Sequence, residues 1–252
     1  MDPTDRDAAA GSAPTPEDAL DTFLTRAQRA VRTGDGPGTT IPRGAAGLLD
    51  LDALTLNMLA LGDHLELLWS DPAEGLGPVL DNLQYTLGDG PALDAARQAR
   101  TLAEPDLSAV DQARWPLFLP AADKIPVRAV IAVPLSLGAA TIGVLTGYRT
   151  TPGPLTPVQL HGLHRLGRIM LHLLHNELTG TGADTDASGS VRLYRAEVHQ
   201  ATGFLANELG ITMGQALLRL RAHAAAHDQP LTDLARGLLD RRLPPDALTG
   251  RR

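Results

Sequence analysis

A stretch of small and polar residues divides this chain into two unequal parts. Residues 179–190 are TGTGADTDASGS and contain no large apolar side chain. A segment of this composition has nothing to bury and is typical of a flexible linker. In a chain of 252 residues, we therefore expect two folding units, one before the linker and one after it.

The N-terminal residues are expected to fold only in part. Residues 1–14 are rich in Ala, Asp, Gly, Pro and Thr, a composition typical of disorder. Thr15-Pro16-Glu17-Asp18 then has the pattern of a helix start: an N-cap, Pro at the first helical position and early acidic residues. Residues 1–41 are thus predicted to be a disordered arm that carries a helix over 16–33.

Residues 42–178 combine strand and helix patterns. Gly62-Asp63 separates two apolar runs, as in a β-hairpin, and two β-rich runs lie further along the chain. The predicted strands are 53–60, 64–69, 128–137 and 141–149. The predicted helices are 73–87, 92–100 and 157–178. This mixture favours an α+β domain with an antiparallel sheet flanked by helices.

The segment after the linker is predicted to be all helix, over residues 191–247. Apolar residues keep helical spacing from Val191 to Leu209, and Thr212 to Gln215 has the spacing of a capping box. Asp228-Gln229-Pro230 then separates the second helix from a third, expected over 231–243. The result is a short domain of three helices.

The charge of the chain differs between its two parts. Residues 1–190 carry 13 basic and 23 acidic groups, whereas residues 191–252 carry 9 basic and 6 acidic groups. A basic segment on an acidic protein favours an anionic partner for that end alone. A chance imbalance in a short helical domain is an equally simple interpretation.

Several classes of protein are excluded or disfavoured. The chain has no cysteine, which rules out disulfides, thiolate metal sites and a cysteine nucleophile. We find no long apolar run, secretion signal or catalytic motif, and His64 beside Asp63 makes no triad alone. We therefore expect a cytoplasmic protein that is not an enzyme, with no cofactor and no metal site.

The C-terminal segment resembles the ANTAR domain, a three-helix RNA-binding module of bacterial transcription antiterminators. The resemblance lies in Ala201-Thr202-Gly203, Gly210, Leu220-Arg221-Ala222-His223-Ala224 and Leu234-Ala235, at matching spacing over residues 198–239. The family has a Lys at the position of Thr202. A Thr makes hydrogen bonds but carries no charge for a phosphate, so the resemblance implies weaker RNA binding here.

The middle of the chain resembles the GAF domain, which often precedes ANTAR. The resemblance is carried, in order, by WSDP (69–72), LQYTLGDGPALDA (83–95), ARWPLFLPAA (113–122), VRAVIAVPLSLGAATIGVLTGYR (127–149) and PLTPVQL (154–160). Relatives often have a Cys in the glycine-rich stretch, where this chain has Ala92. The resemblance implies a pocket for a small ligand or a dimer interface, and the identity of the ligand does not carry over.

Candidate RNA contacts follow from the ANTAR resemblance and from the basic charge. Arg221 is the first candidate because it matches the family's Arg, and Arg side chains present a charged bidentate fork to phosphate. The further candidates are Arg219, Thr202, Gly203, Arg195, Arg192 and Arg236. The alternative is that these residues form a solvated helix surface. Of the two nearby aromatic residues, Phe204 is expected in the core, and Tyr194 is undecided.

Four histidines and one arginine form a polar stripe on the helix expected over 157–178. At 100° per residue, His161, His164, Arg168, His172 and His175 fall on one side, opposite the leucines. A pH- or metal-responsive seam is one interpretation. A solvated face of a core-packed helix is favoured, because no carboxylate shares the stripe.

These observations predict a GAF–ANTAR regulator. The ANTAR domain would bind an RNA hairpin in a nascent leader transcript, and the GAF domain would sense a ligand or partner. The long helix at 157–178 would be the dimer element of a homodimer. The alternatives are a sensor or interaction module whose helical tail no longer binds RNA, and DNA binding by the three helices.

Overall fold

A five-stranded antiparallel sheet forms the centre of the first domain. The computed structural model describes residues 15–33, 43–60, 64–179, 195–227 and 229–248. The strand order is β2-β1-β5-β4-β3, so β2 and β3 are the edges of the sheet. The strands are β1 (Ala53–Ala60), β2 (His64–Asp71), β3 (Leu102–Glu104), β4 (Ala129–Leu137) and β5 (Ala140–Arg149).

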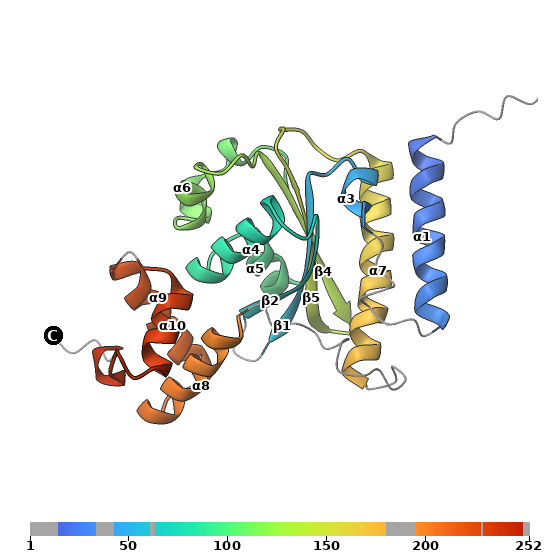
Figure 1. Ribbon diagram of the computed structural model, residues 1–252. Coiled ribbons are helices and arrows are strands. Elements are labelled where there is room, and N and C mark those ends of the chain that lie inside the picture. Colours follow the sequence, from blue (N-terminus) through green and yellow to red (C-terminus); the bar gives the residue numbers. More distant parts are fainter. Residues whose placement is uncertain (1–14, 34–42, 61–63, 180–194, 228, 249–252) are drawn as a thin grey trace, which may run out of the picture.

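Helices cover both faces of this sheet, as Figure 1 shows. On one face lie α4 (Leu76–Leu87), α5 (Pro91–Gln98) and α6 (Phe118–Ala122). On the other face lie α7 (Pro157–Thr179), α1 (Pro16–Thr33) and the short α3 (Ala45–Leu48). The expected antiparallel sheet flanked by helices is therefore confirmed, and β3 is a short edge strand that the sequence patterns did not predict.

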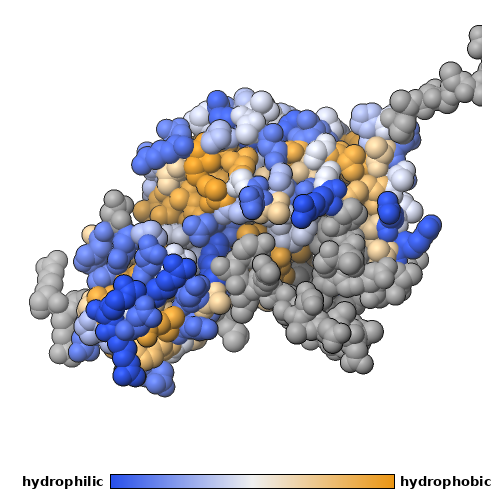
Figure 2. Space-filling model, in the orientation of Figure 1, coloured by the Kyte–Doolittle hydropathy of each residue, from blue (hydrophilic) through white to orange (hydrophobic). Residues whose placement is uncertain are grey.

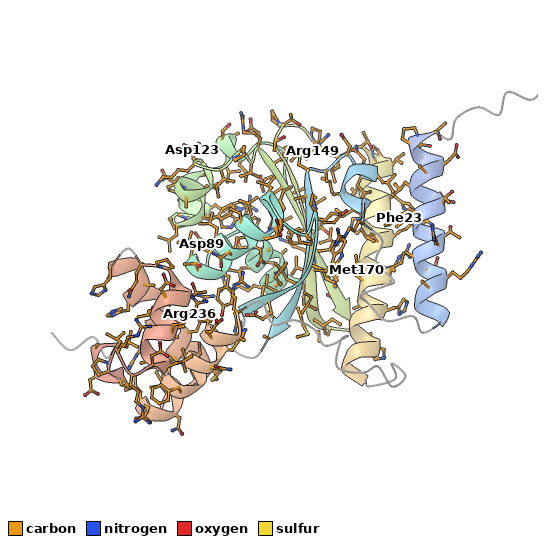
Figure 3. All side chains as sticks on the ribbon, in the orientation of Figure 1. Phe23, Asp89, Asp123, Arg149, Met170 and Arg236 are labelled. Atoms are coloured by element: carbon orange, nitrogen blue, oxygen red, sulfur yellow. The ribbon has the colours of Figure 1, made fainter. Side chains whose placement is uncertain are left out.

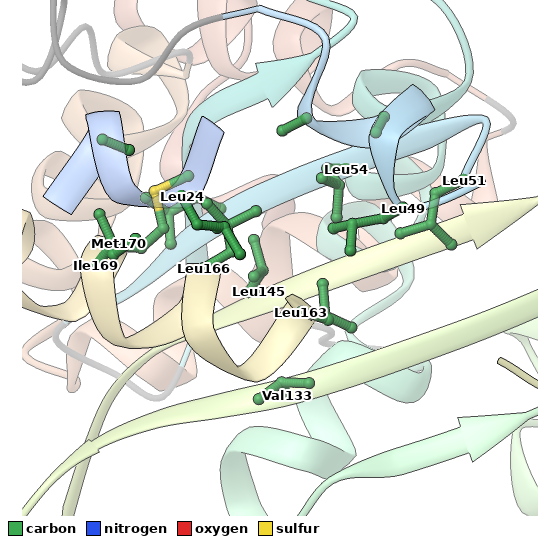
Figure 4. Packing of buried hydrophobic residues seen from close by; sticks show 14 of the residues in the cluster. Leu24, Leu49, Leu51, Leu54, Val133, Leu145, Leu163, Leu166, Ile169 and Met170 are labelled. Carbon is green, nitrogen blue, oxygen red and sulfur yellow. The ribbon is translucent and has the colours of Figure 1, made fainter. Parts of the chain in front are cut away.

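The alternation of side chains along β1 explains why both faces of the sheet are covered. Leu54 and Leu56 belong to the apolar cluster beneath α7, whereas Ala53 belongs to the cluster beneath α4 and α5. Successive residues of a strand point to opposite faces, so a strand whose two sets of side chains are both buried is covered on both faces. Figure 4 shows the first cluster, with Leu163, Leu166 and Met170 of α7 packed over the sheet.

Helix α1 packs against α7 and extends the first domain beyond its expected N-terminal boundary at residue 42. Leu20 and Leu24 are buried in the cluster beneath α7, and Figure 3 shows Phe23 on the side of α1 that faces α7. A side chain at Gly162 of α7 would place its Cβ 2.7 Å from Leu20 Cδ2, so glycine permits this close approach. The helix expected over 16–33 is confirmed, but its role as part of an arm is not.

Three helices form the second domain: α8 (Ala196–Leu209), α9 (Met213–Ala226) and α10 (Leu231–Leu239). Thr212 and Gln215 make the expected capping box, and Gly210 ends α8 in the left-handed conformation. The helix expected over 231–243 is too long. It ends at Leu239 because Arg241 has φ +57° and the next two backbone N–H groups turn back to the Gly237 carbonyl.

Some predictions fall on residues outside the described ranges. These are the disorder of 1–14, the linker at 180–190, and the positions of Arg192 and Tyr194. The short 3-10 segments η1 (Leu107–Ala109), η2 (Gln112–Arg114) and η3 (Pro245–Leu248) complete the described elements. In the part of the chain that the structure describes, no helix is both long enough and apolar enough to cross a membrane.

Candidate nucleic-acid interface and domain junction

A buried ion pair joins the two domains. Arg195, at the start of α8, places its Nη2 2.5 Å from Oδ2 of Asp81 on α4. Its side chain is 5 % exposed, and its guanidinium lies 4.0 Å from the ring centroid of Tyr85. An arginine held in this way has its charge compensated inside the protein. In this arrangement Arg195 is therefore not exposed to RNA, although it was a candidate contact.

Asp81 is held by both domains. Its Oδ1 accepts a hydrogen bond of 2.5 Å from Nδ2 of Asn57 on β1, while its Oδ2 faces Arg195. Burial raises the pKa of Asp81, and the facing charge of Arg195 opposes that rise. Burial of this carboxyl group therefore costs free energy, and its ion pair with Arg195 offsets part of that cost.

Tyr85 belongs to α4 but packs in the core of the helical domain. It is 4 % exposed and lies in one apolar cluster with residues such as Val198, Leu220 and Leu234. Burial raises the pKa of its hydroxyl, and the nearby charge of Glu66 adds to this rise. The first domain therefore supplies one of the aromatic side chains that fill the core of the second.

Arg221, the first candidate for RNA contact, lies against the first domain. Its guanidinium is 5.1 Å from the ring centroid of Tyr85, and a Cβ on Gly88 would be only 3.0 Å from its Nη1. Burial lowers the pKa of Arg221. The docked arrangement of the domains thus partly covers this arginine.

Thr202 faces the interior of the helical domain. Its side chain is 2 % exposed, and its hydroxyl donates a hydrogen bond of 2.6 Å to the carbonyl of Val198 one turn earlier. This is the usual bond of a threonine inside a helix. The predicted role of Thr202 as an RNA contact is incompatible with this position, because its hydroxyl is enclosed.

The other candidate contacts do not gather on one surface. Arg236 is exposed and faces Glu197 at 3.3 Å and Asp233 at 3.6 Å. Arg219 is partly buried on α9. Because it lies two residues before Arg221, its side chain points about 200° away from that of Arg221 around the helix axis. Gly203 is partly buried. Figure 2 shows hydrophilic side chains over much of this domain, and Figure 3 marks Arg236 among them.

The junction also contains residues that sequence patterns missed. Glu66 of β2 is 1 % exposed and faces His199 of α8 and His64 of its own strand. The alternation His64-x-Glu66 on a predicted strand was a signal that these two side chains share a face. Nothing in the sequence connected them to His199, which lies in another domain.

The glycine-rich turn of the first domain is structural. Gly88 and Gly90 have positive φ angles of +66° and +134°, and Asp89 accepts hydrogen bonds of 3.0 Å from the backbone N–H groups of Leu117 and Phe118. Figure 3 marks Asp89 at this turn. The turn therefore links α4 to α5 and holds the start of α6.

Neither tryptophan lines the apolar cavity in the first domain. A cavity of about 300 Å³ lies between β3, β4 and the start of α7, where its walls include Ile131, Leu155 and His164. Trp115 is fully buried elsewhere and donates from Nε1 to Asp94 Oδ2 at 3.0 Å. Trp69 packs on the cluster beneath α7. Trp115 is therefore a core residue, and Trp69 is half-buried at the edge of the core.

The polar stripe of α7 lies on its exposed side. His161, His164, Arg168, His172 and His175 are all exposed, whereas Leu163, Leu166 and Met170 are buried on the sheet. His164 is 3.4 Å from the hydroxyl of Thr101 through Nε2. This arrangement is that of a solvated face on a core-packed helix.

These features define a class: an α+β domain joined through a buried polar junction to a basic three-helix domain. Residues 193–239 match the family model of the ANTAR domain, so the chain carries an ANTAR domain made of α8, α9 and α10. We call the first domain GAF-like, after its sequence motifs. The chain thus joins this five-stranded α+β domain to an ANTAR domain.

Solved structures similar to the first domain include a GAF domain of a phosphoenolpyruvate-protein phosphotransferase from Acinetobacter. It is 12% identical, with a TM-score of 0.46 over 65% of this chain and 98% of that one. Free methionine-R-sulfoxide reductase from Neisseria meningitidis is 17% identical, with a TM-score of 0.48 over 67% of this chain and 96% of that one.

A third similar structure is the phycocyanobilin-bound GAF domain of a cyanobacterial phytochrome. It is 10% identical, with a TM-score of 0.48 over 66% of this chain and 98% of that one. No curated protein sequence is significantly similar to this chain.

Proposed function

We propose that this chain is an RNA-binding transcription antitermination regulator. Its ANTAR domain binds a hairpin in a nascent leader transcript, and its GAF-like domain senses a small ligand or a partner. The observation that carries this proposal is the match to the ANTAR domain over residues 193–239, which spans all three helices of the second domain. An RNA partner of this kind implies a function in the cytoplasm.

The junction gives the GAF-like domain a means of control. Arg221 lies against Tyr85 and Gly88 of α4 and its following turn, so RNA reaches this arginine more readily when the domains separate. A ligand that binds the separated arrangement better would shift the population toward it and raise RNA affinity. In this proposal the GAF-like domain is the sensor and the ANTAR domain binds RNA, and the two domains share one buried interface.

A homodimer is part of the proposal. The apolar side of α7 packs on the sheet and α1 packs along α7, so the polar stripe of α7 is the face that remains for such a contact. Sedimentation of the full chain would give its mass in solution directly. A monomer at all concentrations used would contradict this part of the proposal.

The test of RNA binding uses the full chain and a paired-hairpin leader RNA at two salt concentrations. Arg221→Ala is expected to lower the affinity roughly tenfold, the scale of a lost arginine contact. Arg26→Ala, an exposed arginine of α1, is the matched control and is expected to have no effect. Binding no stronger than to random RNA, at either salt concentration, would contradict the proposal.

The second candidate function is a sensor or interaction module whose ANTAR domain no longer binds RNA. Two observations favour it: the enclosed hydroxyl of Thr202 and the ion pair that holds Arg195. The same experiment separates the candidates. The alternative predicts that no leader hairpin binds, with the junction intact or broken.

A further inference from the structure

We propose that His64, Glu66 and His199 form a binding site for a divalent transition metal ion of the zinc class. One nitrogen or oxygen atom from each of these residues lies within 4.8 Å of the others. His64 and Glu66 come from the edge strand β2 of the GAF-like domain, and His199 comes from α8 of the ANTAR domain. A bound ion would therefore join the two domains.

The distances fit ligands that surround a single ion. His199 Nε2 lies 3.0 Å from Glu66 Oε2, and His64 Nε2 lies 3.5 Å from Glu66 Oε1. Zinc bonds to nitrogen and oxygen are about 2.0–2.2 Å long, so two ligand atoms of a tetrahedral site are about 3.4 Å apart. The two measured separations lie within about 0.5 Å of this value.

Glu66 has the surroundings of a metal ligand. Its side chain is 1 % exposed, and within the described residues neither of its carboxylate oxygens accepts a hydrogen bond. His199 Nε2 likewise makes no hydrogen bond within the described residues, although it lies 3.0 Å from Glu66 Oε2. A buried carboxylate without hydrogen bonds is costly, and a coordinated cation would satisfy it.

The ligand atoms of the site select the kind of metal, against the charge of two nearby arginines. Arg195 Nη1 is 3.8 Å from Glu66 Oε2, but its Nη2 is bound to Asp81. Arg221 also acts on Glu66 through its charge. The positive charges of these arginines oppose the binding of any cation, so the bonds to the ligand atoms must outweigh this repulsion. The two imidazoles favour an ion that binds nitrogen strongly, as zinc and cobalt do and magnesium and calcium do not.

The position of the site determines what the ion would do. With ligands in both domains, it would stabilise the docked arrangement in which Arg221 lies against Tyr85 and Gly88. Metal loading would then lower the affinity of the full chain for leader RNA. This consequence rests on the proposed function, whereas the metal site itself does not.

The test is a cobalt titration of the full chain after treatment with a chelator. We expect each chain to bind one cobalt ion tightly and to show the visible absorption of a tetrahedral cobalt centre. Zinc is expected to displace this cobalt ion. His199→Ala is expected to abolish this tight binding; His199 is partly exposed, so the change leaves the core intact. Glu66→Gln, which keeps the size of the side chain, is a second variant with the same expected loss, and circular dichroism confirms that both variants fold.

The matched control removes another pair of histidines. His223 and His227 are one turn apart on and just after α9, with ring centroids 4.0 Å apart, and they could bind metal on the surface. His223→Ala/His227→Ala is expected to retain the tightly bound cobalt ion. Equal cobalt binding by the wild type and His199→Ala, or loss in the α9 variant alone, would overturn the proposal. Neither result depends on whether the chain binds RNA.

Discussion

Arg195, just before α8, and Asp81 of α4 form an ion pair of 2.5 Å that is almost fully buried between the two domains. The pair ties the start of the ANTAR domain to the helix that covers the sheet of the GAF-like domain. Because Asp81 also accepts a hydrogen bond from Asn57, the contact continues into β1, an inner strand of the sheet. A change in the sheet thus has a direct path to the helical domain.

Removal of Asp81 is predicted to destabilise the chain strongly. Asp81→Ala leaves a buried arginine without its carboxylate, and a broken buried pair of this kind costs about 3–5 kcal/mol. Urea denaturation of the full chain measures the loss. Asp240→Ala is the control, because the pair Asp240–Arg242 is more than half exposed and such pairs contribute less than about 1 kcal/mol. Equal losses for the two variants would show that the junction does not depend on the Arg195 pair.

Thr202 is predicted to have little influence on RNA affinity. Thr202→Val keeps the shape of the side chain and removes the hydroxyl that donates to Val198. The expected cost is about 1 kcal/mol of stability, the scale of one hydrogen bond, with RNA affinity changed less than about twofold. A gel-shift titration beside a thermal melt checks both values. A large loss of RNA affinity at unchanged stability would place the hydroxyl on the RNA.

The pKa of His223 is predicted to lie below the ordinary value for histidine. Burial lowers the pKa of this imidazole, and the charge of His227 lowers it further. The unfolded chain then binds the proton more readily than the folded one, so this contribution to stability is present at high pH and is lost as pH falls through the unfolded value of about 6.5. An NMR titration gives the pKa directly. His227→Ala should raise it, and an unchanged value would contradict the role of His227.

Local signals predicted the elements of the fold well. Thr156 and Gln159 at the start of α7, like Thr212 and Gln215 at the start of α9, make the capping contacts that their spacing indicates. Caps and apolar spacing involve residues within one or two turns, so they are visible in the sequence. The strands of the hairpin and of β4 and β5 were predicted for the same reason.

Contacts between distant segments could not be predicted in this way. The docking of α1 depends on the absence of a side chain at Gly162, and the core of the ANTAR domain depends on Tyr85 from the other domain. The sequence alone suggests that Arg195 is a surface arginine, because only the tertiary structure shows Asp81 beside it. In each case the partner lies far along the chain, and only the tertiary fold connects the two. Sequence patterns could therefore suggest RNA contacts by residue type, but they could not show that Arg195 and Thr202 are buried.

Gly88 is predicted to permit the close packing of the two domains. It has φ +66°, and a Cβ there would be 3.0 Å from Nη1 of Arg221. Gly88→Ala therefore combines the backbone cost of a left-handed alanine, about 1 kcal/mol, with a tight contact that displaces the guanidinium of Arg221. Gly138→Ala is the matched control, because Gly138 has φ +62° and a Cβ there would meet no other described atom within 4 Å.

The two glycine variants separate backbone strain from domain docking. Both are expected to lose similar stability in urea denaturation, but only Gly88→Ala should expose the junction to limited proteolysis and raise the affinity of the full chain for a leader hairpin. The rise follows because the displaced Arg221 becomes accessible to phosphate. If the two variants bind RNA equally and resist protease equally, the contact between Gly88 and Arg221 does not restrain the ANTAR domain.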